Sequence, residues 1–168
     1  MKTNIQALMN LISEEERYLN NRTYTIKTYA LNTTVEELDG RVNIIEDNKE
    51  AFDLDFEALE TSVKKLSKLK SVLYQKNNEF KLSDGRTIQQ AIVDNNYLKR
   101  MKAAYEQLIY IKSSKKRCSE VTNSYFECKA VNFDIDLIRK RLSEIDKIIQ
   151  DTDFEISKLN SIEFEIDI

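Results

Sequence analysis

The scarcity of helix breakers constrains this chain more than any other sequence feature. It has no proline, and Gly40 and Gly85 are the only glycines among 168 residues. Proline ends helices, and glycine in a helix interior costs roughly 1 kcal/mol relative to alanine. Charged residues make up 33% of the chain, and apolar residues recur between them at helical spacing. The sequence therefore predicts a mainly α protein rather than a sandwich or an α/β fold.

A tight turn precedes the central predicted helix. Residues 83–86 (SDGR) are typical of a turn, because glycine accepts a positive φ and aspartate bonds nearby backbone. Thr87 and Gln90 have the spacing of a capping box. Apolar residues then recur at helical spacing as far as Ile109, and the cations after it suit the negative end of a helix dipole. The stretch 81–117 therefore predicts a capped turn and one long helix.

Three more stretches have helical periodicity: residues 4–31, residues 53–78, and a last one that is capped by Asn132 or Asp134 and runs to Leu159. The apolar positions of the second are Phe56, Leu59, Val63, Leu66, Leu69 and Leu73. The third keeps an almost unbroken a/d spacing, with Thr152 as its one polar residue. In the first, Glu15 and Arg22 interrupt the heptad, which favours a bundle over a two-stranded coiled coil. We expect residues 1–168 to form a single domain, an antiparallel bundle of four long helices.

The remaining segments are acidic or β-prone. Residues 32–52 form an acidic connection in which 42–45 favour a short strand; the spacing of the carboxylates matches no calcium loop, so we interpret it as solvated. Residues 121–131 are rich in β-branched and aromatic side chains, and 161–168 alternate strictly between apolar and mostly acidic residues. We expect this late strand and the C-terminal tail to pair as a small β element. Two alternatives to this pairing remain. The strand at 42–45 could join it as a third strand, or the tail could pair with a strand of a neighbouring subunit.

Composition excludes several kinds of site. The chain has no histidine, which removes Ser-His and Cys-His catalysis and zinc sites that need imidazole. Cys118 and Cys128 are too few and too far apart for a Cys₄ or CxxC site. They could pair if their segments formed a hairpin, although free thiols are favoured in a reducing compartment. We therefore expect a non-enzymatic protein without a metal or cofactor.

Hydropathy predicts a cytoplasmic protein. The first apolar run reaches Glu14 too early for a signal peptide, and no run approaches the roughly 18 to 20 apolar residues that cross a bilayer. No pattern indicates a specific small molecule.

Two groups are candidate binding residues. Asp84 and Arg86 lie in a predicted exposed turn and are candidates for a ligand or subunit contact; the alternative is a purely structural turn and cap. The candidates for phosphate contact are Lys112, Lys115, Lys116 and Arg117, which share the basic stretch 99–117 with Lys99, Arg100 and Lys102. Nucleic-acid binding usually needs exposed aromatics among the cations and a basic total, whereas the net charge is -3. A solvated helix surface is therefore the favoured interpretation.

Three short motifs carry a family resemblance: residues 82–88 (LSDGRTI), 126–131 (FECKAV) and 158–160 (KLN) with the tail after them. In these motifs and in the order of its helices, the chain resembles the septicolysin-like family of small bacterial proteins. The resemblance implies a helical, oligomeric protein with no accepted catalytic residues. The family's name further implies a membrane-active toxin.

Apolar stripes this long on a chain this small leave ridges that one subunit cannot bury, so we expect a homo-oligomer. The predicted function is a non-enzymatic oligomeric scaffold or interaction protein. The alternatives are nucleic-acid or phosphate-ligand binding through the 99–117 basic face, and the membrane activity that the resemblance implies.

Overall fold

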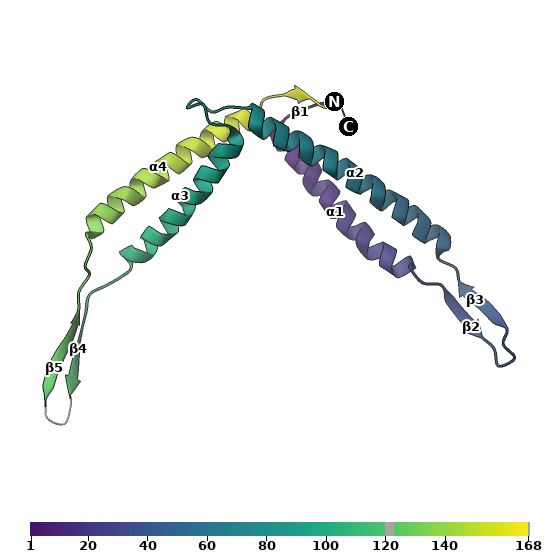
Figure 1. The fold of residues 1–168 in the computed structure, drawn as a ribbon, viewed down its shortest axis with the longest axis horizontal. Helices are drawn as coiled ribbons and strands as arrows, with labels where there is room; N and C mark the ends of the chain where they lie inside the picture. Colours follow the sequence, from purple (N-terminus) through teal and green to yellow (C-terminus); the bar gives the residue numbers. More distant parts are fainter. Residues whose placement is uncertain (120–122, 168) are drawn as a thin grey trace. The chain divides into compact units, whose positions relative to one another are not determined.

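The computed structural model describes residues 1–119 and 123–167, and it is mainly helical, as the sequence predicts (Figure 1). Its helices are α1 (Ile5–Tyr29), α2 (Lys49–Glu79), α3 (Ile88–Ile109) and α4 (Ile135–Asn160). Its strands are β1 (Lys2–Thr3), β2 (Thr33–Glu36), β3 (Val42–Glu46), β4 (Ser114–Ser119), β5 (Ser124–Lys129) and β6 (Phe164–Glu165). These strands form separate antiparallel pairs, β1–β6, β2–β3 and β4–β5.

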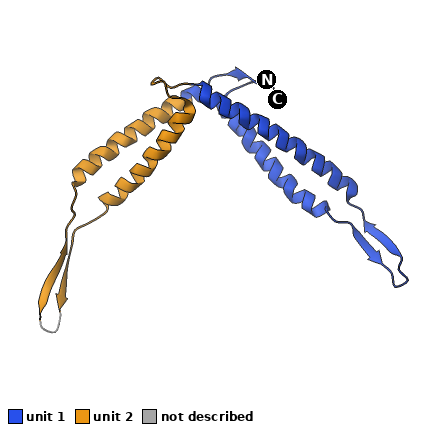
Figure 2. Ribbon diagram, viewed as in Figure 1, with its two compact units in different colours: residues 1–80, 158–168 blue, residues 81–157 orange. Residues whose placement is uncertain are grey.

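The chain divides into two compact units, residues 1–80 with 158–168 and residues 81–157 (Figure 2). In the first unit α1 and α2 run antiparallel, with Glu15 bonded to Lys65 and Arg22 to Asp55. In the second unit α3 and α4 lie side by side (Figure 1), and polar pairs such as Lys102 with Asp146 bridge them. Packing of all four helices into one bundle stays a prediction, and so does the single domain.

The seam between α1 and α2 changes from apolar to polar along its length. Near the chain termini it holds a core cluster of Leu8, Ile12, Leu69 and Ile166. Further along, the inward positions of α2 are Asp55 and Ser62, which are only 6% and 3% exposed. Their partners are Arg22 and Glu15, the two residues that interrupt the predicted heptad of α1.

The apolar stripe predicted for α2 is wrong at two positions. Phe56 and Val63 are each 46% exposed, because the polar residues one position before them take the inward places. Asp55 and Ser62 can be buried there since each meets a hydrogen-bonding group of α1, which satisfies its polar atoms.

The second unit confirms the clearest sequence signals. Thr87 Oγ1 accepts from the Gln90 amide, and the Gln90 side chain accepts from the Thr87 amide, which completes the capping box. The Asp134 carboxylate accepts the amide of Leu137 at the start of α4. The buried positions of α4 are Ile138, Ile145, Ile149 and Thr152, and they lie on the predicted a/d stripe.

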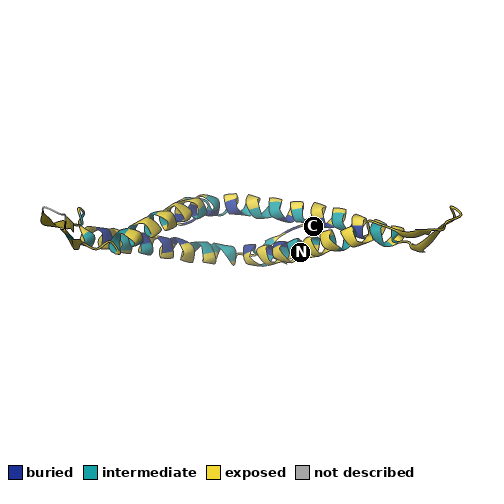
Figure 3. Cartoon of the chain, turned by 90° about the horizontal axis from the view of Figure 1, so that it is seen from below, coloured by how far each residue is buried: buried dark blue, intermediate teal, exposed yellow. Residues whose placement is uncertain are grey.

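The short strand predicted at 42–45 is present as β3, and two β-ribbons stand where the rest of the acidic connection and the end of the central helix were predicted. The acidic connection forms the β2–β3 ribbon, in which every residue is exposed, and α2 begins at Lys49 rather than at residue 53. The helix α3 ends at Ile109, so the cations at 115–117 lie on β4 instead of on a helix terminus. In Figure 3 both ribbons are exposed, whereas buried positions recur along the helices.

The predicted pairing of the late strand with the C-terminal tail is also wrong. The late strand, β5, pairs with β4, and the tail strand β6 pairs with β1 at the N-terminus. Backbone bonds fix the tail there, since the Met1 ammonium donates to the Ile166 carbonyl at 2.8 Å and Ile166 is buried in the first unit's core. Val121 and Thr122 of the predicted late strand, and Ile168 of the tail, lie outside the described residues.

The two halves of the chain repeat one another at a spacing of 83 positions. Each half runs helix, ribbon, helix. The buried positions of α1 are Ile5, Leu8 and Ile12, and those of α3, each 83 positions later, are Ile88, Ala91 and Asn95. Asp55, Ser62 and Leu69 of α2 correspond in the same way to Ile138, Ile145 and Thr152 of α4. The N-cap residues of α1 and α3, Asn4 and Thr87, are also 83 positions apart. The repeat therefore includes the helix caps as well as the buried positions.

Candidate functional site

The SDGR turn forms as predicted, and its charged side chains bond to one another. Gly85 has φ of +87°, and the Asp84 carboxylate accepts from the Arg86 amide at 2.9 Å and from Arg86 Nε at 2.8 Å. Arg86 Nη1 also donates to Asp94 of α3 at 2.7 Å. Hydrogen bonds from the side chain and the amide of Arg86 lower the pKa of Asp84, and the side-chain bonds to Asp84 and Asp94 raise the pKa of Arg86.

A second contact fixes the turn against α4. The amide and the hydroxyl of Ser83 both donate to the Glu155 carboxylate, at 2.8 and 2.7 Å. The bonding groups of Asp84 and Arg86 are therefore used within the turn and at the start of α3. This arrangement explains both residues as structural, and their role in a ligand or subunit contact stays a prediction.

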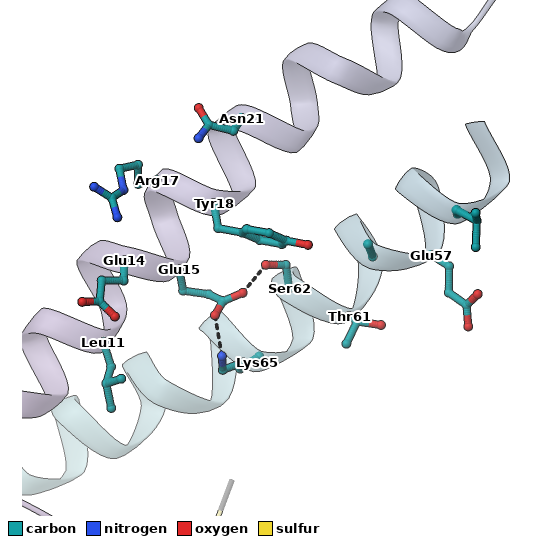
Figure 4. A pocket seen from close by; sticks show the side chains of 12 residues that line it. Leu11, Glu14, Glu15, Arg17, Tyr18, Asn21, Glu57, Thr61, Ser62 and Lys65 are labelled. Carbon is teal, nitrogen blue, oxygen red and sulfur yellow. Dashed lines mark hydrogen bonds and ion pairs between the residues drawn. The ribbon is translucent and has the colours of Figure 1, made fainter. Parts of the chain in front are cut away.

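An open groove of about 950 Å³ lies along α1 and α2 (Figure 4). It is lined by Leu11, Glu14, Glu15, Arg17, Tyr18, Asn21, Leu54, Glu57, Ala58, Thr61, Ser62 and Lys65. Figure 4 shows the Glu15 carboxylate reaching across from α1 to Ser62 and Lys65 on α2. Sequence reasoning missed this groove because it treated Glu15 as an interruption of a heptad.

The chemistry of the groove is that of a polar seam. The hydrogen bond from Lys65, with Nζ 2.6 Å from Glu15 Oε2, and the bond from Ser62 lower the pKa of Glu15. A carboxylate with a lowered pKa is a weaker proton acceptor, so it activates the Ser62 hydroxyl little as a nucleophile. The bonds at Glu15 therefore hold α1 and α2 together.

Two cations in the helical part of the predicted basic face, Lys99 and Lys102, pair with carboxylates of α4. Lys102 Nζ lies 2.6 Å from the Asp146 carboxylate, which raises the pKa of Lys102. Lys99 Nζ lies 3.6 Å from Asp153, which also accepts from Asn95 Nδ2 at 2.7 Å. These cations serve the α3–α4 seam, and the structure separates them from the group at 112–117.

The cations at 115–117 lie on β4, which pairs with β5, the strand that carries Phe126. Arg117 pairs with Phe126 and Lys115 with Cys128, so these four side chains share one face of the ribbon. The Lys115 ammonium lies 4.4 Å from the centre of the Phe126 ring, within range of a cation–π interaction. Glu127 lies on the other face, where it pairs with Lys129 at 3.6 Å. One face of the ribbon thus combines two cations and an aromatic ring without a carboxylate among its described residues.

The register also explains why the two thiols remain free. Cys118 lies opposite Tyr125 and Cys128 opposite Lys115, which places the two sulfurs on different faces of the ribbon. A hairpin does form here, but its pairing does not bring the thiols together.

Two further kinds of feature are absent from the described part of the chain. Residues 1–119 and 123–167 contain no group of three or more Cys, Asp or Glu side chains arranged to hold a metal ion. No described helix combines the length and the apolar character that crossing a membrane requires.

The comparison with solved structures gives a match in fold. A crystal structure of a functionally unknown conserved protein from Corynebacterium diphtheriae superposes with a TM-score of 0.67 and 17% sequence identity. The match covers 98% of this chain and 100% of that one. No curated protein matches the sequence. At this identity the neighbour shows a shared fold alone.

The family assignment corrects the resemblance drawn from short motifs. Neither the structural neighbour nor the matching family model is septicolysin-like, so that assignment is wrong. The membrane activity that its name implied therefore loses its only support. The motifs were turn, strand and cap sequences, which many helical proteins share for structural reasons. The matching model spans residues 30–160 and describes a family of unknown function. The chain belongs to that family, DUF6847.

Proposed function

We propose that this protein is a homo-oligomeric, non-enzymatic scaffold or interaction protein built from two-helix layers. The observation that carries the proposal is its accessible surface of 12739 Å². Two separate compact proteins of about 10 kDa each would expose together only about 10,500 Å². This reference value counts the two units separately. The excess of about 2,200 Å² per chain corresponds to about 4,400 Å² for a pair of chains, within the range of large obligate interfaces.

The exposed side chains support covering by another copy. A layer of two helices buries one stripe of each helix, and apolar residues on the other faces stay in contact with water. The large apolar residues that the helices expose include Tyr24, Leu54, Phe56, Val63, Tyr74, Val93, Tyr97, Leu137 and Ile148. Helices from a second copy would bury such residues, and the predicted four-helix packing would then form between subunits.

The non-enzymatic part of the proposal rests on the chemistry of the side chains. The chain lacks histidine, and the pKa of Glu15, the central carboxylate of the groove, is lowered rather than raised toward neutrality. We place the protein in the cytoplasm, where its two free thiols would remain reduced.

The concentration dependence of thermal unfolding tests the proposal. Assembly stabilises the folded state by mass action, so the midpoint should rise by several degrees between about 1 and 100 μM protein. The variant Phe56→Glu/Val63→Glu places charge on an exposed apolar face of α2 and should weaken this dependence. Ser67→Glu/Ser71→Glu adds the same charge at exposed polar positions of α2 and should retain it. A wild-type midpoint that stays constant over this range would contradict the proposal.

A second candidate function is supported by one observation, the sorting of charge on the β4–β5 ribbon. Lys115, Arg117 and Phe126 share a face, and this combination suits a single-stranded nucleic acid, whose phosphates meet the cations while a base stacks on the ring. Fluorescence anisotropy with labelled single-stranded RNA would test it. Lys115→Ala/Lys116→Ala/Arg117→Ala should abolish a salt-dependent signal. Lys64→Ala/Lys68→Ala/Lys140→Ala, which removes the same charge elsewhere, should keep it.

A further inference from the structure

The two ribbons carry opposite charge at equivalent places in the repeat. The acidic ribbon, residues 32–47, has five carboxylates and one guanidinium, a net charge of -4. The basic ribbon, residues 112–119 and 124–129, has five cations and one carboxylate, a net charge of +4, or +3 with Glu120 of the connecting segment. Each ribbon links the two helices of its own half. The chain therefore has two ribbons of the same architecture and opposite net charge.

Several charges on each ribbon lack an ionic partner. In the acidic ribbon Arg41 pairs with Asp39 and Glu37, which leaves Glu36, Glu46 and Asp47 without an ion pair to any described residue. In the basic ribbon Glu127 pairs with Lys129 and Lys115 lies over an aromatic ring. Lys112, Lys116 and Arg117 form no ion pair within residues 1–119 and 123–167. Three carboxylates without an ion pair on one ribbon thus match three cations without an ion pair on the other, among the described residues.

Exposed apolar groups accompany these charges. On the acidic ribbon the exposed fractions are 48% for Val35, 112% for Leu38, 60% for Val42 and Ile44, and 65% for Ile45. On the basic ribbon Phe126 is 58% exposed. Each ribbon pairs only its own two strands, so the outer edges of both strands offer backbone groups for pairing. Two-stranded ribbons are marginally stable alone, and docking two of them would stabilise both.

We infer that the acidic ribbon of one copy docks on the basic ribbon of a second copy of this chain. The inference rests on the proposed homo-oligomer and specifies which surfaces meet. Charge complementarity selects the pairing, because contacts between two acidic or two basic ribbons would place like charges together. A twofold pair makes the acidic–basic contact twice, since the same surfaces are exchanged between both subunits.

Charge reversal tests the inference with two variants that should fail alone and succeed together. Glu36→Lys/Glu37→Lys/Glu46→Lys changes the acidic ribbon to a net charge of about +2. Asp47 is not substituted, because its carboxylate accepts the Lys49 amide at the start of α2. Lys112→Glu/Lys116→Glu/Arg117→Glu changes the basic ribbon to about -2. All six side chains are exposed, and circular dichroism checks that each variant keeps its helices.

Light scattering and native mass spectrometry at about 150 mM NaCl measure the result. Each variant alone should self-associate at least about tenfold more weakly than wild type, and an equimolar mixture should recover a mixed assembly. Recovery in the mixture excludes pairing of the two ribbons within one chain. Higher salt should weaken wild-type assembly.

The remaining outcomes separate this inference from the proposed function. A monomeric wild-type protein would overturn both. A wild-type oligomer that neither variant alters would overturn the ribbon pairing and leave the oligomer to other surfaces. If the oligomer is unchanged and the basic-ribbon variant loses RNA binding, the ribbon pairing is also overturned. That result would assign the basic ribbon to the second candidate function.

Discussion

Asn77 and Asn160 occupy equivalent positions in the repeat and share an unusual state. Each buries its side-chain oxygen without a hydrogen-bond partner among the described residues. They lie 83 positions apart, near the ends of α2 and α4. A buried asparagine in a helical seam reduces stability but specifies which residues can pack opposite it. The recurrence of the same residue at both helix ends indicates a common constraint on how each half ends its second helix.

Replacing Asn77 by leucine should stabilise the protein. An unpaired buried carbonyl costs roughly 1 to 3 kcal/mol, and leucine has the same branching at Cγ without the polar atoms, so we expect a gain of about 1 kcal/mol in the free energy of unfolding. Urea denaturation measures it, and Asn78→Leu, at the exposed neighbouring position, is the control. A loss of stability in Asn77→Leu would contradict the view that the unpaired oxygen reduces stability at this position.

Acid should weaken the α1–α2 seam through Glu15. The Lys65 and Ser62 hydrogen bonds hold the pKa of Glu15 below its ordinary value of 4.5. Because the folded pKa is the lower one, this stabilisation is fully present above the unfolded value and is lost as pH falls through the folded value. Glu15→Gln should therefore be less stable than wild type at pH 7, and the difference should shrink well below pH 4.

Unfolding free energies at pH 7 and in acid check this dependence. Glu14→Gln, on the exposed rim of the groove, should leave the acid dependence of wild type unchanged. An acid dependence of the same size in Glu15→Gln and wild type would place the responsible carboxylate elsewhere.

Gly85 should be required for the turn between the second and third helices. Its φ of +87° disfavours any residue with a Cβ, and a Cβ added at this position would meet no atom within 4 Å, so the cost of alanine comes from the backbone alone. We expect Gly85→Ala to lower the free energy of unfolding by about 1 to 2 kcal/mol. Gly40 has a similar φ of +83° at the exposed acidic ribbon, so Gly40→Ala should have a smaller effect on global unfolding. Equal effects would contradict the view that the ribbon is the less stable element.

The Arg22–Asp55 pair should show an asymmetry between its partners. Asp55 is buried, so Arg22→Leu leaves a carboxylate without its counter-ion, whereas Asp55→Ile places an apolar residue in the seam. The repeat supports this choice, because the position equivalent to Asp55 is Ile138. We expect Arg22→Leu to destabilise more than Asp55→Ile, and the double variant to recover part of the loss. A double-mutant cycle measured by urea denaturation gives the coupling, and additive effects would contradict it.

Local signals made part of this fold predictable from sequence. The Thr87–Gln90 capping box and the a/d stripe of α4 depend on residues a few positions apart, and the structure confirms both. The inward faces of α2 were harder to predict. Asp55 and Ser62 are buried only because Arg22 and Glu15 lie opposite them, and no periodicity within α2 carries that information.

Long-range pairing and the repeat were also beyond single-sequence reasoning. The alternation of the tail predicts a strand but does not identify β1 as its partner, because that choice depends on where the termini meet. The repeat is hidden because equivalent buried positions hold different residues, such as Ile12 and Asn95, or Leu69 and Thr152. For the candidate site, the cations at 115–117 could be identified, but their alignment with Phe126 depends on strand register.

Sedimentation equilibrium of the wild-type chain tests the proposed assembly most directly. We expect a mass at micromolar concentration that is a multiple of 19.7 kDa, with dissociation only on dilution. A mass of 19.7 kDa that stays constant up to about 100 μM would contradict it, because the exposed apolar surface would then remain uncovered in solution.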